Sequence, residues 1–327
     1  MSCSRIHQSQ AFTHETVLLT ETVAMTLGVR DLSELAGRKV SRVFVDATFG
    51  RGGHSRLLLE YLSDDSTLIV FDKDPQAIET AQQLAQTDKR VRVVHDSFAN
   101  LSGALAELGI TKIDGLMADL GVSSPQLDDG SRGFSFMRDG AVDMRMDTTR
   151  GEPVSAWLAK VDEETLANVL YTYGEERYSR RIARAIKSME SHQSTLALAE
   201  TIKQAHPAWQ KGKHPATQSF QALRIFINNE LGDIDGFLVQ SIDVLKAGGH
   251  LAVISFHSLE DRRIKQFLHN HSRGRWEGDD KLPIPPKRAK YFGKPVRIAP
   301  SSDEIKQNPR ARSAYLRGAT RNDVMVD

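Results

Sequence analysis

The sequence predicts an α/β fold in which a doubly wound parallel sheet is interrupted by an all-helical insert. Up to about residue 120, short apolar segments alternate with segments of helical spacing, a rhythm typical of a parallel sheet with helices on both faces. From Ser123 to Arg150 the chain is rich in Gly, Ser, Asp and Met, and from Val154 to about Ala205 the pattern is helical. A strand pattern returns only near residue 250. We therefore expect one discontinuous sheet domain, residues 1–130 and 216–327, around a helical insert at 131–215.

The first strand is predicted at Arg42–Ala47, because this short apolar run is bounded by charged residues. A Gly-rich loop follows, and a helix is expected over Ser55–Leu62. Pro75 suits the first turn of a helix at Pro75–Ala85, where its missing N–H costs nothing. The other elements predicted in this half are the strands Thr67–Phe71, Val91–His95 and Ile113–Asp119 and the helix Leu101–Leu108.

The rest of the chain is predicted to be mostly helical. After a segment rich in Gly, Ser, Asp and Met, helical spacing occurs at Val154–Leu158, Glu163–Tyr173, Arg177–Met189, Thr195–Gln204, Thr217–Leu231, Ile234–Leu245 and Leu259–Leu268. A fifth strand is predicted at His250–Phe256. Gly274–Pro300, which is Pro-rich and basic, is expected to form a long loop, and Ser313–Gly318 to form a final strand at the sheet edge.

Composition indicates an ordinary globular protein with no membrane segment. Of 327 residues, 40% are hydrophobic and 26% charged, and no apolar run approaches the ~18 residues that span a bilayer. Met1–Gln10 is polar and lacks the apolar core of a signal peptide. The single cysteine, Cys3, excludes an internal disulfide framework and a cysteine zinc site. We expect a cytoplasmic protein.

Charge is unevenly distributed along the chain. The net charge is +1, but the segment from Arg262 to the end carries +9 and the remainder −8. A basic C-terminal third suggests a polyanionic partner, and a solvated tail explains it equally well.

The loop Asp46–His54 connects the first predicted strand to a helix and predicts a cofactor site. Its glycines let the backbone turn sharply and approach a ligand closely, although many such turns only pack a helix on a sheet. Asp72 ends the next strand, 20 residues after Gly52. This is the spacing expected for a carboxylate that accepts hydrogen bonds from ribose hydroxyls.

Two cofactors fit this geometry, S-adenosylmethionine (SAM) and a nicotinamide dinucleotide. The loop departs from G-x-G-x-x-G, because Ser55 stands where a third glycine would allow a pyrophosphate to approach the helix. Asp46 would repel a diphosphate but suits a cationic sulfonium or amino group. We therefore favour SAM and keep an NAD-dependent enzyme as the alternative.

Two further strand ends are candidate site positions, because ligands bind at the carboxyl ends of strands in open α/β sheets. Phe98 follows the third strand and either packs on an adenine or belongs to the core. Asp119 ends the fourth strand and opens a polar turn that runs to Gln126, where several polar groups gather. Such crowding favours a functional role for Asp119 over a purely structural cap.

Taken together, the motifs resemble those of the RsmH (MraW) family of bacterial methyltransferases, which modify the N4 amine of a cytidine in small-subunit (16S) ribosomal RNA. The matching segments span nearly the whole chain in order: His14–Leu19, Asp46–His54, Asp119–Asp128, Arg132–Gly140, Asp143–Asp147, Tyr173–Arg177, His214–Thr217, Ser255–Asp261 and Asn308–Arg312. The resemblance implies a class I SAM-dependent methyltransferase (Rossmann-like) domain with an inserted helical domain that recognises the substrate.

The resemblance also implies roles for single residues. Gly52, Gly53 and His54 would contact SAM in the first loop. Asp72 would hold the ribose and Phe98 would lie by the adenine. Asp119 and Gln126 would complete the site, with no metal. The partner would be ribosomal RNA or the small subunit, and a homodimer is one assembly consistent with the sequence.

A mechanism follows for the transfer to an exocyclic amine. The lone pair of this amine is delocalised into the ring, so a hydrogen-bond acceptor must localise it, and Asp119 is the candidate. A stacked base must also leave its stack. Phe134 and Phe136 either stack on it or anchor their own loop to the core, and His257 either orients substrate or caps the next helix with Ser258.

Basic clusters in three segments suggest an RNA surface. They are Arg177, Arg180, Arg181, Arg184 and Lys187 on one helix, Lys211, Lys213 and His214 in a loop, and Lys287, Arg288 and Lys290 in the Pro-rich segment. Phosphate contacts of this kind carry no sequence readout, and each cluster is also consistent with a solvated surface. A third hypothesis is therefore an RNA-binding protein without catalysis.

Overall fold

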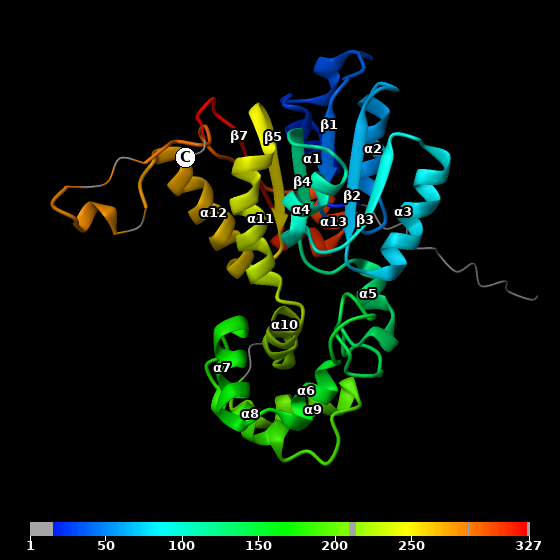
Figure 1. Cartoon of the computed structure of the whole chain (residues 1–327). Helices are drawn as coiled ribbons and strands as arrows, with labels where there is room; N and C mark the ends of the chain where they lie inside the picture. The colour runs from blue at the N-terminus through cyan, green and yellow to red at the C-terminus, as the bar shows by residue number, and fades with distance from the viewer. Residues whose placement is uncertain (1–15, 209–213, 277, 285, 287, 326–327) are drawn as a thin grey trace, which may run out of the picture.

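The computed structural model describes residues 16–208, 214–276, 278–284, 286 and 288–325. In this part of the chain a seven-stranded sheet has the order β3-β2-β1-β4-β5-β7-β6 (Figure 1). The strands are β1 Val43–Asp46, β2 Thr67–Asp72, β3 Val91–His95, β4 Ile113–Asp119, β5 Leu245–Ser255, β6 Val296–Ile298 and β7 Tyr315–Thr320. Strands β1 to β5 are parallel, while β7 is antiparallel to both β5 and β6.

Helices cover both faces of the sheet. Successive strand residues point to opposite sides, so apolar strands give the sheet two apolar faces, and both pack against helices. Phe44 packs with the helices of one face, and Val45 packs with those of the other. The first face carries α1 Leu19–Leu27, α2 Gly53–Tyr61 and α3 Pro75–Thr87. The second carries α4 Leu101–Glu107, α11 Glu230–Val244 and α12 Ser258–Arg273. The predicted α/β class is confirmed.

The helical insert has a hydrophobic core of its own. Figure 1 shows it beyond the end of β4, on one side of the sheet domain. Its helices are α5 Ser124–Asp128, α6 Val154–Lys160, α7 Glu163–Gly174, α8 Ser179–Lys187, α9 Thr195–Ala205 and α10 Ala216–Ile227. Helix α10, on the sheet-domain side of the boundary expected at 215, contributes Phe220 and Leu223 to this core.

Several elements differ from the sequence-based expectation. Ser313–Gly318 was expected at the sheet edge, but β7 lies between β5 and β6, and β6 forms the edge. The helix expected over Thr217–Leu231 is divided, because Asn229 adopts a left-handed conformation with φ 52° between α10 and α11. Helices α1 and α13 Ser302–Gln307 were not expected. No helix in the described ranges combines the length and apolar character needed to cross a membrane.

Candidate active site

Three carboxylates mark the carboxyl ends of three adjacent strands, β2, β1 and β4. Asp46 ends β1, Asp72 ends β2 and Asp119 ends β4. Strand β1 lies between the other two, with Asp46 beside Val70 of β2 and Met117 of β4 in the register. The topology therefore brings the three aspartates to one edge of the sheet, where α/β proteins bind their ligands.

Asp119 is held in place by its backbone and keeps a free carboxylate oxygen. Its N–H donates to Thr48 Oγ1 at 2.6 Å. Its Oδ2 lies 3.9 Å from His54 Nδ1, and its Oδ1 is buried with no hydrogen-bond partner among the described residues. Burial, together with the nearby Asp46 and Glu260 charges, raises the pKa of Asp119 to about 8. The Oδ1 atom of Asp119 therefore has no partner among the described residues and can form a hydrogen bond with a bound ligand.

Asp46 lies beneath the first loop and is almost fully buried. It accepts hydrogen bonds from Ser55 Oγ at 2.6 Å and from the Thr48 N–H at 3.2 Å. Burial raises its pKa to about 6, an effect that the Asp72 charge increases and these two hydrogen bonds reduce. Asp46 therefore both ties the loop to α2 and adds negative charge to the site.

Asp72 connects the loops that follow β1 and β2. Its Oδ2 accepts the Gly50 N–H at 2.8 Å, and its Oδ1 accepts the Asp74 N–H at 2.9 Å. Burial, with the Asp74 charge, raises the pKa of Asp72 to about 6 despite these bonds. Each carboxylate oxygen has a second lone pair, so Asp72 can still accept a ribose hydroxyl.

The glycines of the first loop are required by close contacts within the protein. A Cβ at Gly52, where φ is +77°, would lie 2.5 Å from Phe49 Cζ, and one at Gly53 would lie 1.9 Å from Thr16 Oγ1. His54 is buried beside them, with Nε2 3.2 Å from the Val17 carbonyl oxygen. Burial lowers the pKa of His54 to about 4, so its ring is neutral at physiological pH.

Gln126 is joined to Asp74, a residue that the sequence analysis missed. Gln126 Nε2 donates to Asp74 Oδ2 at 2.7 Å, and Gln126 Oε1 accepts the Ser123 N–H at 2.8 Å. The same Asp74 oxygen accepts Arg132 Nη1 at 2.9 Å. Asp74 also caps α3 by accepting the Gln76 N–H. The Asp-Pro pair at 74–75 is a recognisable cap signal, but its contact with Gln126 is not encoded locally.

The candidate aromatic residues pack against the protein. Phe98, in a short 3₁₀ turn, Phe98–Asn100, is partly buried and meets Phe237 edge to face, with ring centroids 5.3 Å apart. Phe134 belongs to the core of the insert. Phe136 packs on His214 and Phe220, with centroids 4.6 and 4.9 Å away. These contacts favour loop anchoring over base stacking for Phe134 and Phe136.

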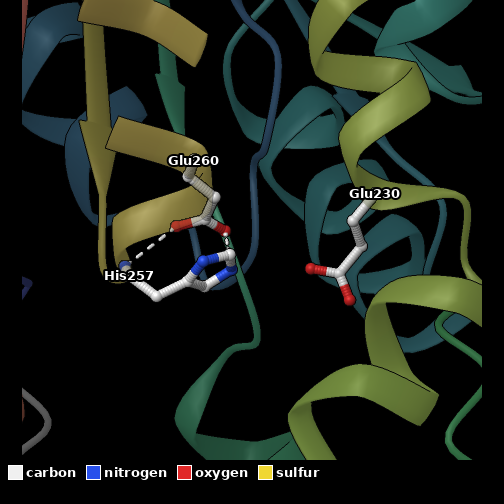
Figure 2. A group of neighbouring side chains, drawn as sticks. All are labelled: Glu230, His257 and Glu260. Atoms are coloured by element: carbon white, nitrogen blue, oxygen red, sulfur yellow. Dashed lines mark hydrogen bonds and ion pairs between the residues drawn. The ribbon is translucent and has the colours of Figure 1, made fainter. Parts of the chain in front are cut away.

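Glu260, whose charge acts on Asp119, belongs to a second polar cluster, which Figure 2 shows. Glu230, His257 and Glu260 place ligand-type atoms within 4.8 Å of one another, and Figure 2 shows Glu230 facing the His257–Glu260 pair. Arg224 binds Glu230 through two hydrogen bonds of 2.7 and 2.8 Å and lies 3.5 Å from His257 Nε2. The Arg224 guanidinium thus already supplies positive charge where a cation would bind.

The other members of this cluster have structural roles. Glu260 accepts the N–H groups of Phe256 and His257 at 2.8 and 3.3 Å, which caps the start of α12. His257 is the N-cap residue of that helix, so the capping interpretation of His257 is the one that the structure favours. Ser258 instead donates to Glu175 Oε2 of the insert at 3.3 Å.

The charge of the site fits a cationic cofactor. Within the described ranges, Asp46, Asp72 and Asp119 form no ion pair with a lysine or arginine, and a neighbouring carboxylate further destabilises the anionic form of each. A positive sulfonium or ammonium group would relieve this repulsion, whereas a diphosphate would increase it. A Cβ at Gly50 would meet no atom within 4 Å, so this loop also leaves space.

Some predicted positions lie outside the described residues. They are Cys3, Met1–Gln10, the first residues of the His14–Leu19 motif, Lys211, Lys213 and Lys287. Of the stripe on α8, Arg184 pairs with Glu163 at 3.3 Å and Lys187 donates to the Leu158 carbonyl, so these two cations have partners.

Known proteins similar to the chain support the same interpretation. The family model of the MraW methylase family matches residues 11–322. The chain is 68% identical over 320 residues to "Ribosomal RNA small subunit methyltransferase H" of Psychrobacter cryohalolentis, covering 96% of this chain and 94% of that protein. It is 52% identical over 308 residues to the protein of the same name from Acinetobacter baumannii, covering 94% and 97%.

Among solved structures, the chain is similar to an rRNA methylase from Streptococcus thermophilus, with a TM-score of 0.40 and 10% identity over 88% of this chain and 92% of the other. The family match confirms the predicted methyltransferase class and its SAM cofactor, and it sets aside the NAD-dependent alternative. With the sheet order and the family match in agreement, the chain belongs to the MraW methylase family.

Proposed function

We propose that the protein transfers the methyl group of SAM to the N4 amine of a cytidine in small-subunit (16S) ribosomal RNA. The names of the relatives support RNA as the substrate. The observation that carries the chemistry is the buried Oδ1 atom of Asp119, which has no partner among the described residues and lies at the ligand-binding edge of the sheet.

The carboxylates and the first loop form the proposed cofactor site. When bound, SAM supplies an electrophilic methyl group on a positively charged sulfur. Gly52, Gly53 and His54 shape the loop against it, and Asp72 accepts hydrogen bonds from the ribose. Phe98 lies on the adenine side, while Asp119 and Gln126 close the site after β4. Asp46 and Asp119, which no lysine or arginine of the described residues pairs with, support this arrangement, because a cation beside them favours their ionised forms.

Asp119 is the proposed acceptor for the amine. An exocyclic amine becomes nucleophilic when a hydrogen-bond acceptor draws on its N–H and localises the lone pair on nitrogen. Opposite charge favours the ionised form of a carboxylate, so Asp119 ionises once a cation lies beside it, despite its raised pKa. The carboxylate then accepts the N–H, and alignment of the amine with the methyl group supplies much of the rate.

The insert, residues 131–215, is the proposed substrate-recognition unit. It has a separate core, so its surface can vary without disturbing the sheet. It is linked to the active-site edge through α5, which follows β4 directly, and through Arg310 of a 3₁₀ helix, Pro309–Ser313. Arg310 donates to Asp128 Oδ1 at 3.1 Å and also contacts Ser124. These links hold the turn after Asp119 in place beside the substrate.

An Asp119→Asn variant tests the proposed role. We expect it to bind SAM, measured by calorimetry, but to lose at least about a hundredfold in methyl transfer, because an amide is a weaker acceptor and general acid–base groups contribute about 10²–10⁴-fold. The matched variant Asp129→Asn changes a carboxylate on the exposed side of the same loop and should retain activity. Full activity of Asp119→Asn would remove Asp119 from the chemistry.

A further inference from the structure

The corner between α7 and α8, residues 174–181, has the features of a binding surface next to the active site. We propose that this α7–α8 corner holds the backbone of single-stranded RNA as it enters the site. The inference rests on the proposed RNA substrate and adds the surface that grips it.

The corner lies at the same edge of the sheet as Asp119. Glu175 accepts hydrogen bonds from Ser258 Oγ at 3.3 Å and from Arg262 Nη2 at 3.0 Å. Ser258 begins α12, directly after β5. In the β4–β5 register Asp119 pairs with Ile254, so Ser258 lies just beyond the end of the strand next to Asp119. An RNA strand that is bound at the corner therefore lies beside the active site.

The backbone of the corner is fixed by specific contacts. Glu175 adopts a left-handed conformation, φ 52°, which costs a non-glycine residue about 1 kcal/mol. Glu176 is buried and accepts the Tyr178 N–H at 2.9 Å, and its Oε1 lies 3.6 Å from His206 Nε2. A Cβ at Gly174 would lie 2.6 Å from the Gln218 carbonyl oxygen. The corner thus presents its exposed side chains from a rigid base.

Three exposed arginines on the corner have no acidic side chain as a partner in the described part of the chain. Arg177, Arg180 and Arg181 form no ion pair or side-chain hydrogen bond within the described ranges, while Ile182, Ala183 and Ile186 bury the opposite face of α8. Arg184, one turn further along, pairs with Glu163. Positive charge that the protein leaves unpaired is available to phosphates, whereas that of Arg184 is already compensated.

Aromatic rings accompany these charges. Tyr178 is 37% exposed and has its ring against the edge of His206, with centroids 4.8 Å apart, and Tyr171 on the adjacent α7 is 64% exposed. Exposed aromatic rings next to arginines are typical of surfaces that bind single strands, because each unstacked base can stack on a ring. Double-stranded RNA offers no free base faces, so the aromatic rings favour a single strand.

Binding of a fluorescein-labelled oligocytidine RNA, followed by anisotropy over a series of KCl concentrations, tests the charges. Arg177→Ala, Arg180→Ala and Arg181→Ala are each expected to reduce the slope of log K against log[salt] by about 0.7, the value for one lost phosphate contact on a single strand. Arg184→Ala is the matched control, since it removes the same side chain from the same helix. Its slope should equal that of the wild type.

The stacking role has its own pair of variants. Tyr178→Leu should weaken RNA binding about tenfold, while Tyr178→Phe, which keeps the ring, should bind like the wild type. SAM binding by every variant, measured by calorimetry, shows that the fold and cofactor site are intact. In methyl transfer, Arg177→Ala, Arg180→Ala and Arg181→Ala should raise KM for RNA and leave kcat unchanged, whereas Arg184→Ala should leave KM at the wild-type value.

The outcomes separate this inference from the proposed function. Wild-type protein that neither binds nor methylates RNA would contradict the proposed function itself. Wild-type protein that methylates RNA, with all four arginine variants giving the same slope, would overturn only the corner as the binding surface. Equal affinity of the wild type for a fully duplexed RNA would overturn the single-strand assignment.

Discussion

At the scale of single residues, the site is defined by carboxylates whose negative charge the protein does not compensate. Burial raises the pKa of Asp46 and Asp72 to about 6 and that of Asp119 to about 8. Carboxylates that are removed from water are costly as anions unless they are paired, so three carboxyl groups without a lysine or arginine partner in the described part of the chain indicate a role other than stability. Binding of a cationic cofactor is the proposed role.

The raised pKa of Asp119 predicts how its substitution affects stability at different pH values. Because the folded-state pKa, about 8, exceeds the ordinary aspartate value of 3.8, the folded state holds a proton that the unfolded state releases. The contribution of this protonation to the free energy of unfolding is therefore fully present below about pH 4, and it is lost as pH rises through about 8. As pH rises from 4.5 to 8.5, the free energy of unfolding of cofactor-free Asp119→Asn should increase relative to that of the wild type by more than about 1 kcal/mol.

Urea unfolding of both proteins at several pH values measures this difference. Titrating groups that do not interact with Asp119 are common to the two chains, so their contributions cancel in the comparison, and what is left is the titration of Asp119 with its neighbours Asp46 and Glu260. A stability difference that stays constant over this range would contradict the raised pKa of Asp119.

At the scale of elements, Asp74 joins three parts of the chain. It caps α3, accepts Gln126 from α5 and forms an ion pair with Arg132 of a 3₁₀ turn, Gly130–Arg132. Both members of this ion pair are buried. Loss of one partner would leave the other charge without compensation, which is more costly than loss of the pair.

Asp74→Ala should therefore lower the free energy of unfolding by about 3 kcal/mol. The double variant Asp74→Ala with Arg132→Met should recover part of that loss, because no unpaired guanidinium remains. Asp31→Ala removes an exposed N-cap and should cost about 1 kcal/mol or less. Equal losses for Asp74→Ala and Asp31→Ala in denaturant unfolding would show that the junction adds nothing beyond a cap.

Elements with a strong local pattern were predictable from the sequence. The predicted bounds of β3 and β4 are those of the structure, because each apolar run is bounded by polar residues. The edge strand β6 has only three residues, two of them exposed, and so carries no apolar alternation. The N-cap residue of helix α1 is Leu18, whose side chain cannot cap a helix, so the beginning of α1 had no sequence signal.

At the scale of the whole molecule, the sheet places the predicted site residues at one edge, but their contacts depend on the tertiary fold. The strand-end positions of Asp72 and Asp119 were predictable because strands end at fixed places in the pattern. The contact of Gln126 with Asp74, 52 residues away, and the Glu260 charge near Asp119 were not, since they arise only when distant segments pack. The same packing brings the α7–α8 corner to α12.

The insert and the sheet domain together produce the proposed function. In this proposal the sheet domain provides the anionic cofactor site, while the insert provides Arg177, Arg180 and Arg181, which have no acidic partner among the described residues. Opposite charge on the two surfaces suits the two ligands, a cationic cofactor and a polyanionic RNA. A protein that only bound RNA would have no use for the unpaired carboxylates of the sheet domain.

Methyl transfer from isotope-labelled SAM to small ribosomal subunits that lack the modification tests the central claim most directly. The RNA is digested after the reaction, and the labelled nucleoside is identified by mass spectrometry, with naked small-subunit RNA and DNA as parallel substrates. The account predicts label in N4-methylcytidine of the small-subunit RNA. Label in a different nucleoside, or no label in any substrate despite measurable SAM binding, would contradict it.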